Sequence, residues 1–140
     1  MRLFVAIPVS EDLRDHLRMF SSGVRGAKWV RPEGMHMTLR FIGECDQETA
    51  RDIDAELDDI RLPGFSLAAR RLGYFERGPR IHSIWAGFEG LEALLHLQSS
   101  VEAAVVRAGF PRESRKFTPH VTLARLKGGR PGDVGPWIEA

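Results

Sequence analysis

The sequence predicts an α+β fold in a single domain, residues 1–140, and three observations lead to that prediction. Short runs rich in β-branched and aromatic residues alternate with longer segments whose apolar residues recur every three or four positions. A chain of this length has the usual size of one globular domain. A strand, a helix and a strand carrying His-x-Thr-Leu also occur twice, which indicates an internal repeat of two similar halves.

The first half of the chain predicts two strands and two helices. Residues 3–7 form an apolar run that Pro8 ends, and Ser10 is suited to cap a helix whose apolar stripe continues to residue 24. Residues 28–31 lead through a turn at 32–34 into a strand over residues 36–42. A second helix begins at Asp46, and its acidic face is expected to be solvated.

The second half predicts an antiparallel hairpin, a third helix and a last strand. Segments 65–75 and 81–88 are joined by a turn over residues 77–80, which we expect to form a loop longer than two residues. Apolar residues at helical spacing run from 91 to 108, with Gly109 as a left-handed cap. The last strand is expected over residues 117–126.

The composition favours a folded globular protein and disfavours several functions. Hydrophobic residues make up 43% and charged residues 28%, and the formal net charge is +1, so nonspecific wrapping of nucleic acid is disfavoured. A small anionic group can still bind at one local site. Cys45 is the one cysteine and has no Cys or His partner at zinc spacing, which disfavours a disulfide and structural zinc. With no apolar run long enough for a membrane span, we expect a cytoplasmic protein.

Two His-x-Thr-Leu motifs carry the candidate chemistry. They begin at His36 and His120, each on a predicted strand, so each histidine shares a strand face with Thr38 or Thr122. One neutral imidazole can take a proton from water while the other, as imidazolium, gives a proton to a departing oxygen. The two hydroxyls can donate hydrogen bonds to phosphate oxygens. The four residues suit phosphodiester hydrolysis that needs no metal ion or other cofactor.

The chain resembles the 2H phosphoesterase superfamily, and within it the bacterial and archaeal RNA 2′,3′-cyclic phosphodiesterases formerly named 2′-5′ RNA ligases. The matching segments are RLFVAIP (2–8), WVRPE (29–33), HMTLRFIG (36–43), WAG (85–87) and FTPHVTLAR (117–125). This resemblance implies a bilobal fold with a pseudo-twofold repeat, in which two antiparallel β-sheets with outer helices surround a central cleft. It also implies hydrolysis of 2′,3′-cyclic phosphates on RNA or tRNA ends to 2′-phosphomonoesters, together with reverse 2′-5′ ligation. No membrane and no obligate protein partner are expected.

The same resemblance implies a role for each site residue. His36 would protonate the 3′-oxygen as general acid, and His120 would activate water as general base. Arg125 matches the arginine that closes the second family motif and would bind phosphate or the nucleotide, although strand alternation from His120 turns it away unless a bulge or the strand end turns it back. Alternation from His36 places Arg40 on the face of the histidine and Phe41 in the core.

Several alternatives stay open. A related enzyme acting on a small cyclic nucleotide, such as ADP-ribose 1″,2″-cyclic phosphate, would need the same four residues, and a noncatalytic module that binds RNA ends would also keep them. Two structural histidines, each hydrogen-bonded to a threonine, are the alternative to any chemistry. Phe4 and Trp29 either stack on a base or pack in the core.

Family members usually extend further beyond the second motif, so we expect this chain to lack their C-terminal strands.

Overall fold

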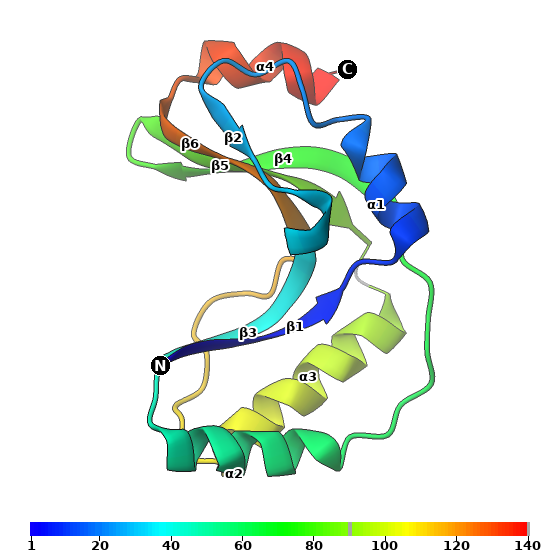
Figure 1. The fold of residues 1–140 in the computed structure, drawn as a ribbon, viewed down its shortest axis with the longest axis vertical. Coiled ribbons are helices and arrows are strands. Elements are labelled where there is room, and N and C mark those ends of the chain that lie inside the picture. Colours follow the sequence, from blue (N-terminus) through cyan, green and yellow to red (C-terminus); the bar gives the residue numbers. More distant parts are fainter. Residues whose placement is uncertain (90, 140) are drawn as a thin grey trace. The chain divides into compact units, whose positions relative to one another are not determined.

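The structure is a computed structural model that describes residues 1–89 and 91–139 (Figure 1). Its elements are β1 (Arg2–Pro8), α1 (Glu11–Arg18), β2 (Ala27–Trp29), the 3₁₀ turn η1 (Pro32–Gly34), β3 (His36–Glu44), α2 (Gln47–Asp58), β4 (Ala69–Arg77), β5 (Arg80–Phe88), α3 (Glu92–Arg107), β6 (His120–Gly129) and α4 (Pro131–Glu139). The last residue of the expected domain, Ala140, lies outside the described residues. Over the described ranges, four helices and two antiparallel sheets confirm the predicted α+β class.

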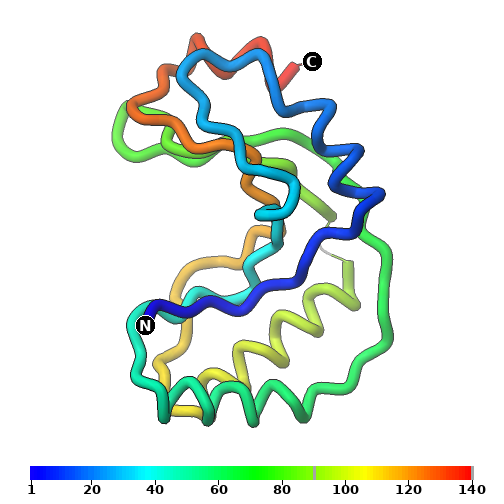
Figure 2. The backbone as a smooth tube through the Cα atoms, viewed as in Figure 1, coloured from blue at the N-terminus to red at the C-terminus, as the bar shows by residue number. Residues whose placement is uncertain are grey.

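The strands form a two-stranded sheet, β1-β3, and a four-stranded sheet with the order β2-β6-β5-β4. The chain divides into two compact units, each assembled from three separate stretches of sequence, as the trace in Figure 2 allows the reader to follow. The first unit comprises Met1–Ile7, Thr38–Leu67 and Gly90–Pro119, and the second comprises Pro8–Met37, Ala68–Glu89 and His120–Ala140. None of the helices in the described ranges has the length and apolar character of a membrane span.

Local capping signals define the helices of the first unit. The Asp46 carboxylate accepts a hydrogen bond from the Thr49 backbone N–H at 2.7 Å at the start of α2, as predicted. That bond, together with one from the Thr49 side chain, holds the pKa of the Asp46 carboxyl below its ordinary value of 3.8. Gly109 ends α3 with φ +111°, and Phe110 N–H donates to Val105 O at 3.3 Å, which confirms the predicted left-handed cap.

Arg40 does not follow the predicted alternation of β3. Its side chain is buried, pairs with Glu102 of α3 at 2.5 Å, and donates to Pro111 O at 2.9 Å. Phe41 is 48% exposed and lies beside the Arg2 guanidinium, so the prediction that Phe41 enters the core is wrong. A buried guanidinium must be paired, and the Glu102 carboxylate on the neighbouring helix provides that partner.

In the second unit, α1 begins as predicted but ends earlier. The Ser10 hydroxyl accepts from Leu13 N–H at 3.2 Å, and the helix stops at Arg18 instead of continuing to residue 24. Val24 remains buried although it is no longer helical. The Ser-Ser-Gly segment at 21–23 has low helix propensity, and Gly23 adopts φ +87°, which explains the early end.

Helix α4 is an element that sequence reasoning missed. It contains Gly132, Gly135 and Pro136, which individually disfavour a helix. Tertiary packing compensates, because Trp137 is 6% exposed and its Nε1 donates to Phe20 O at 2.7 Å. Helix formation here depends on contacts that the local sequence does not reveal.

The β4–β5 hairpin has a tighter turn than predicted. Arg77 pairs with Arg80, so the loop consists of only Gly78 and Pro79. Gly78 has φ +61°, and since proline is confined to negative φ, this combination matches a type II′ turn. Two predicted strands also begin later than expected. Strand β4 begins at Ala69 instead of residue 65, and β6 begins at His120 instead of residue 117.

The Arg40–Glu102 pair generates a stability prediction. Replacing Arg40 by Met leaves the Glu102 carboxylate, whose Oε2 already has no partner among the described residues, without its counter-charge. We expect Arg40→Met to lower the free energy of unfolding in urea by about 3–5 kcal/mol. The control is Arg107→Met, which removes an exposed pair with Glu56 and should cost about 1 kcal/mol or less. Equal losses in the two variants would contradict the assignment of Arg40 to the buried framework.

Candidate functional site

Strand β6 carries the second motif at the centre of the four-stranded sheet. In its antiparallel pairing with β5, His120 lies opposite Gly87 and Thr122 lies opposite Trp85. Residues directly opposite each other in a sheet share a face. His120, Thr122 and Trp85 therefore lie on one face, while Val121 is fully buried on the other.

A β-bulge redirects the residues that follow Thr122. Trp85 pairs with Thr122, but the next β5 residue, Ile84, pairs with Ala124, so Leu123 is an extra residue in β6. Beyond the bulge, Arg125 lies opposite Ser83, which is two residues from Trp85 and shares its face. The bulge thus returns Arg125 to the face of the histidine, against simple alternation.

The registers of β4 and β2 extend this face across all four strands. Arg71 pairs with Gly87, Gly73 with Trp85, and Phe75 with Ser83, while Lys28 pairs with Arg125. We call this surface the His120 face, and its members are Lys28, Arg71, Gly73, Phe75, Ser83, Trp85, Gly87, His120, Thr122 and Arg125. Three of these ten described residues are cationic and none is a carboxylate, so the face is suited to an anion.

Aromatic rings hold the His120 imidazole in place. The Phe75 ring meets it edge-on, with centroids 5.0 Å apart and planes at 87°, and the Trp85 ring lies 5.7 Å away. Phe75 and Trp85 also contact each other at 5.2 Å. Sequence reasoning did not select Phe75 or Arg71 as site residues, because only the β4–β5 register brings them beside the motif.

The two aromatic residues considered for base stacking differ in their surroundings. Trp29 pairs with Ala124 on the opposite face of the sheet and packs against Trp137 of α4, with ring centroids 6.4 Å apart. Phe4 is 48% exposed, so it is not a core residue. Trp29 therefore belongs to the helix-covered side of the sheet, away from the His120 face.

Two glycines give the Trp85 ring its space. A Cβ atom on Gly73 would lie 2.4 Å from the Trp85 ring, and one on Gly87 would lie 2.8 Å from it. No other residue fits beneath the indole at either position without displacing it. The ring is consequently seated directly on the backbone of β4 and β5.

The first motif begins where η1 leads into β3. His36 Nδ1 lies 2.9 Å from Gly34 O, and since a carbonyl oxygen only accepts hydrogen bonds, Nδ1 carries the proton. His36 is exposed, whereas Met37 and Leu39 are buried and Thr38 is half-buried. The predicted alternation therefore holds through the motif, with the histidine and threonine on the less buried side of the strand.

Pairing of β2 with β6 connects the two motifs within the second unit. The pairing continues past Trp29, because Val30 N–H donates to Leu123 O at 2.8 Å. The chain then passes through η1 to His36. His36, His120, Thr122 and Arg125 all belong to this unit, whereas Thr38 begins the stretch of β3 that belongs to the other unit.

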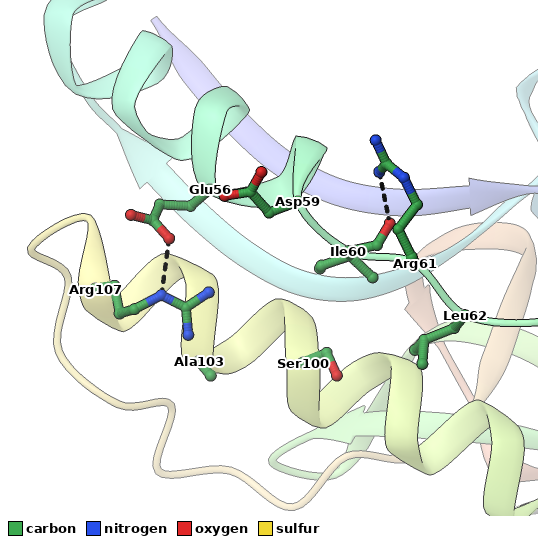
Figure 3. A pocket seen from close by; sticks show the side chains of 8 residues that line it. All are labelled: Glu56, Asp59, Ile60, Arg61, Leu62, Ser100, Ala103 and Arg107. Carbon is green, nitrogen blue, oxygen red and sulfur yellow. Dashed lines mark hydrogen bonds and ion pairs between the residues drawn. The ribbon is translucent and has the colours of Figure 1, made fainter.

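Two surface hollows in the described part of the chain are lined by residues outside the two motifs. A hollow of about 300 Å³ lies between α2 and α3 of the first unit, where Glu56 and Arg107 pair at 2.8 Å (Figure 3). A second of about 200 Å³ lies in the other unit and includes Phe20, Leu72 and Ile138. Within residues 1–89 and 91–139, no group of three or more His, Cys, Asp and Glu side chains is arranged to hold a metal ion.

Comparison with known proteins gives consistent matches over most of the chain. A family model described as LigT like Phosphoesterase matches residues 7–85 and 89–140. A Methanothermobacter thermautotrophicus protein named RNA 2′,3′-cyclic phosphodiesterase is 34% identical over 140 residues, covering 95% of this chain and 75% of that protein. The chain thus spans about three quarters of that relative's length.

Solved structures agree with these sequence matches. The crystal structure of TT0787 of Thermus thermophilus has a TM-score of 0.82 and 33% identity, covering 94% of this chain and 77% of that one. The crystal structure of Escherichia coli LigT complexed with 3′-AMP has a TM-score of 0.77 and 27% identity, covering 93% of this chain and 75% of that one. The likeness therefore extends to both sequence and fold.

The packing of the Trp85 ring against Gly73 can be tested by substitution. In Gly73→Ala the new Cβ must displace the indole, and overpacking of this kind costs about 1–3 kcal/mol. We expect a lower thermal midpoint together with shifted NMR signals of the His120 imidazole, because the Trp85 ring lies against it. Gly132→Ala is the control, since a Cβ there meets nothing within 4 Å, and it should be neutral or stabilising. Unchanged His120 signals in Gly73→Ala would overturn this account.

Proposed function

We propose that this chain, which belongs to the LigT-like phosphoesterase family, hydrolyses 2′,3′-cyclic phosphates at RNA ends to 2′-phosphomonoesters. The observation that carries the proposal is the His120 face, where a histidine and a threonine lie beside cationic side chains with no carboxylate among its ten members. The name of the Methanothermobacter relative supports the RNA substrate, and the 3′-AMP complex of Escherichia coli LigT supports a nucleotide ligand.

His120 is the general base in this proposal. Its neutral imidazole takes a proton from a water molecule as the water oxygen attacks the phosphorus atom. The contacts with Phe75 and Trp85 limit rotation of the ring, so the accepting nitrogen keeps its direction. Such positioning lowers the entropy that must be lost when the transition state forms.

His36 is the general acid. Nδ1 donates to Gly34 O, so in this proposal Nε2 is the nitrogen that acts on the substrate. As the bond between phosphorus and the 3′-oxygen breaks, the protonated Nε2 gives its proton to that oxygen. The reaction yields a 3′-hydroxyl and a 2′-phosphate, and proton exchange with solvent restores the starting forms of both histidines.

The remaining site residues stabilise the phosphate. Hydroxyl groups of Thr38 and Thr122 donate hydrogen bonds to the non-bridging oxygens, whose negative charge grows in the transition state. Arg125, returned to the His120 face by the bulge, adds a charge-assisted donor. No step requires a metal ion or another cofactor.

An RNA 5′-hydroxyl in place of water would give a 2′-5′ linkage by the same proton transfers, and we include this ligation in the proposal.

Substitution of the histidines tests the proposed proton transfers. We expect His36→Ala and His120→Ala each to lower kcat on an oligonucleotide 2′,3′-cyclic phosphate by ~10²–10⁴-fold, because each removes one acid or base. The assay contains a chelator and identifies the product isomer, which should be the 2′-phosphate. His96→Ala is the control, since His96 is an exposed residue of α3 and its loss should leave kcat unchanged. Wild-type protein that is folded but inactive, or activity abolished by the chelator, would refute the proposal.

Substitution of Arg125 tests its proposed contact with the phosphate through kcat/KM. Arg125→Ala should lower kcat/KM by about 10- to 100-fold, since a hydrogen bond to a charged group contributes about 1.5–3 kcal/mol. Arg125→Lys keeps the charge but loses the forked geometry and should recover part of the loss. Arg130→Ala removes an exposed arginine just beyond β6 and should have no effect. If Arg125→Ala resembles Arg130→Ala, the arginine does not contact the phosphate.

A further inference from the structure

Arg71 occupies a defined position on the His120 face. It lies opposite Gly87, which lies opposite His120, so the three residues form one row across β4, β5 and β6. Adjacent strands are about 4.8 Å apart, which places the Arg71 and His120 backbones roughly 10 Å from each other. The arginine is exposed and therefore accessible from solvent.

The Arg71 side chain is held against the aromatic cluster. Its guanidinium carbon lies 5.6 Å from the centroid of the Trp85 ring, a cation–π arrangement. A Cβ on Gly87 would lie 3.2 Å from both Cγ and Nε of Arg71, so the glycine also leaves room for the arginine stem. This contact with the Trp85 ring restricts the guanidinium before any ligand arrives, which reduces the entropy lost on binding.

The hydrogen-bond donors of Arg71 are uncommitted. Within residues 1–89 and 91–139, Arg71 makes no ion pair or hydrogen bond through its side chain, whereas the neighbouring Arg70 pairs with Glu89 at 3.2 Å. A guanidinium whose N–H groups have no protein partner among the described residues presents the fork that matches phosphate oxygens. The same strand thus carries one arginine paired with a carboxylate and one whose guanidinium donors have no partner among the described residues.

We propose that Arg71, in cation–π contact with Trp85, binds a second phosphate of the substrate, the one on the 5′-oxygen of the terminal nucleoside. This inference rests on the proposed function, in which the motif residues take the cyclic phosphate. On an RNA end, one nucleoside separates the cyclic phosphate from the next phosphate, and the His120–Gly87–Arg71 row gives the two anions separate positions on one surface. The site then distinguishes an RNA end from a lone nucleoside cyclic phosphate.

The test compares two substrates that differ only in the second phosphate: adenosine 2′,3′-cyclic phosphate with and without a 5′-phosphate. We expect the wild type to show a kcat/KM about tenfold or more higher for the 5′-phosphorylated substrate, as one charge-assisted contact allows. In Arg71→Met, which keeps an unbranched apolar side chain without the charge, this ratio should fall to about one. Arg70→Met is the matched control from the same strand and should keep the wild-type ratio.

A binding measurement separates failure of this inference from failure of the proposed function. The affinities of adenosine 2′,5′-bisphosphate and adenosine 2′-phosphate are compared by calorimetry in wild type and Arg71→Met. If neither substrate is turned over, the proposed function fails, while a wild-type preference for the bisphosphate that Arg71→Met lacks still supports the second phosphate site. Equal affinities in the wild type, or a preference retained in Arg71→Met, would overturn the inference.

Discussion

The antiparallel register between β5 and β6 is the constraint on which the rest of the candidate site depends. It places His120 opposite Gly87 and Thr122 opposite Trp85, and the extra residue Leu123 turns Arg125 to the same side. A shift by one residue would send all these side chains to the opposite face. Burial resists such a shift, because Val121, Leu123 and Ala124 are completely enclosed in the present register.

The Trp85 ring, whose place is set by this register, packs against several side chains of the His120 face. Glycines at 73 and 87 let the indole rest on the backbone, and the ring in turn contacts Phe75, Arg71 and the His120 imidazole. The Trp85 indole thereby helps to position both His120, the proposed proton acceptor, and Arg71, the proposed phosphate-binding residue. Positioning by packing suits a site that must bind anions, because it uses no carboxylate that would repel them.

Two arginines of the protein show why charge alone does not identify a ligand contact. Arg40 follows the first motif closely in sequence, yet Glu102 and Pro111 O occupy its donors within the first unit. Arg71 belongs to neither motif, yet its donors are free of protein partners within the described residues and its guanidinium lies over the Trp85 ring. The difference lies in the neighbours that tertiary packing provides, and alternation along a strand does not reveal them.

The sequence by itself determined the features that depend on local interactions. The predicted caps at Ser10, Asp46 and Gly109 depend on side chains a few residues apart, and all three are confirmed. The α+β class and each His-x-Thr-Leu motif can likewise be recognised from short stretches of sequence. Tertiary structure alone decided the direction of Arg125, the burial of Arg40, the aromatic cluster around His120 and the existence of α4. Those features depend on pairing and packing between segments far apart in the chain, where burial of apolar surface outweighs the weak preferences of the local sequence.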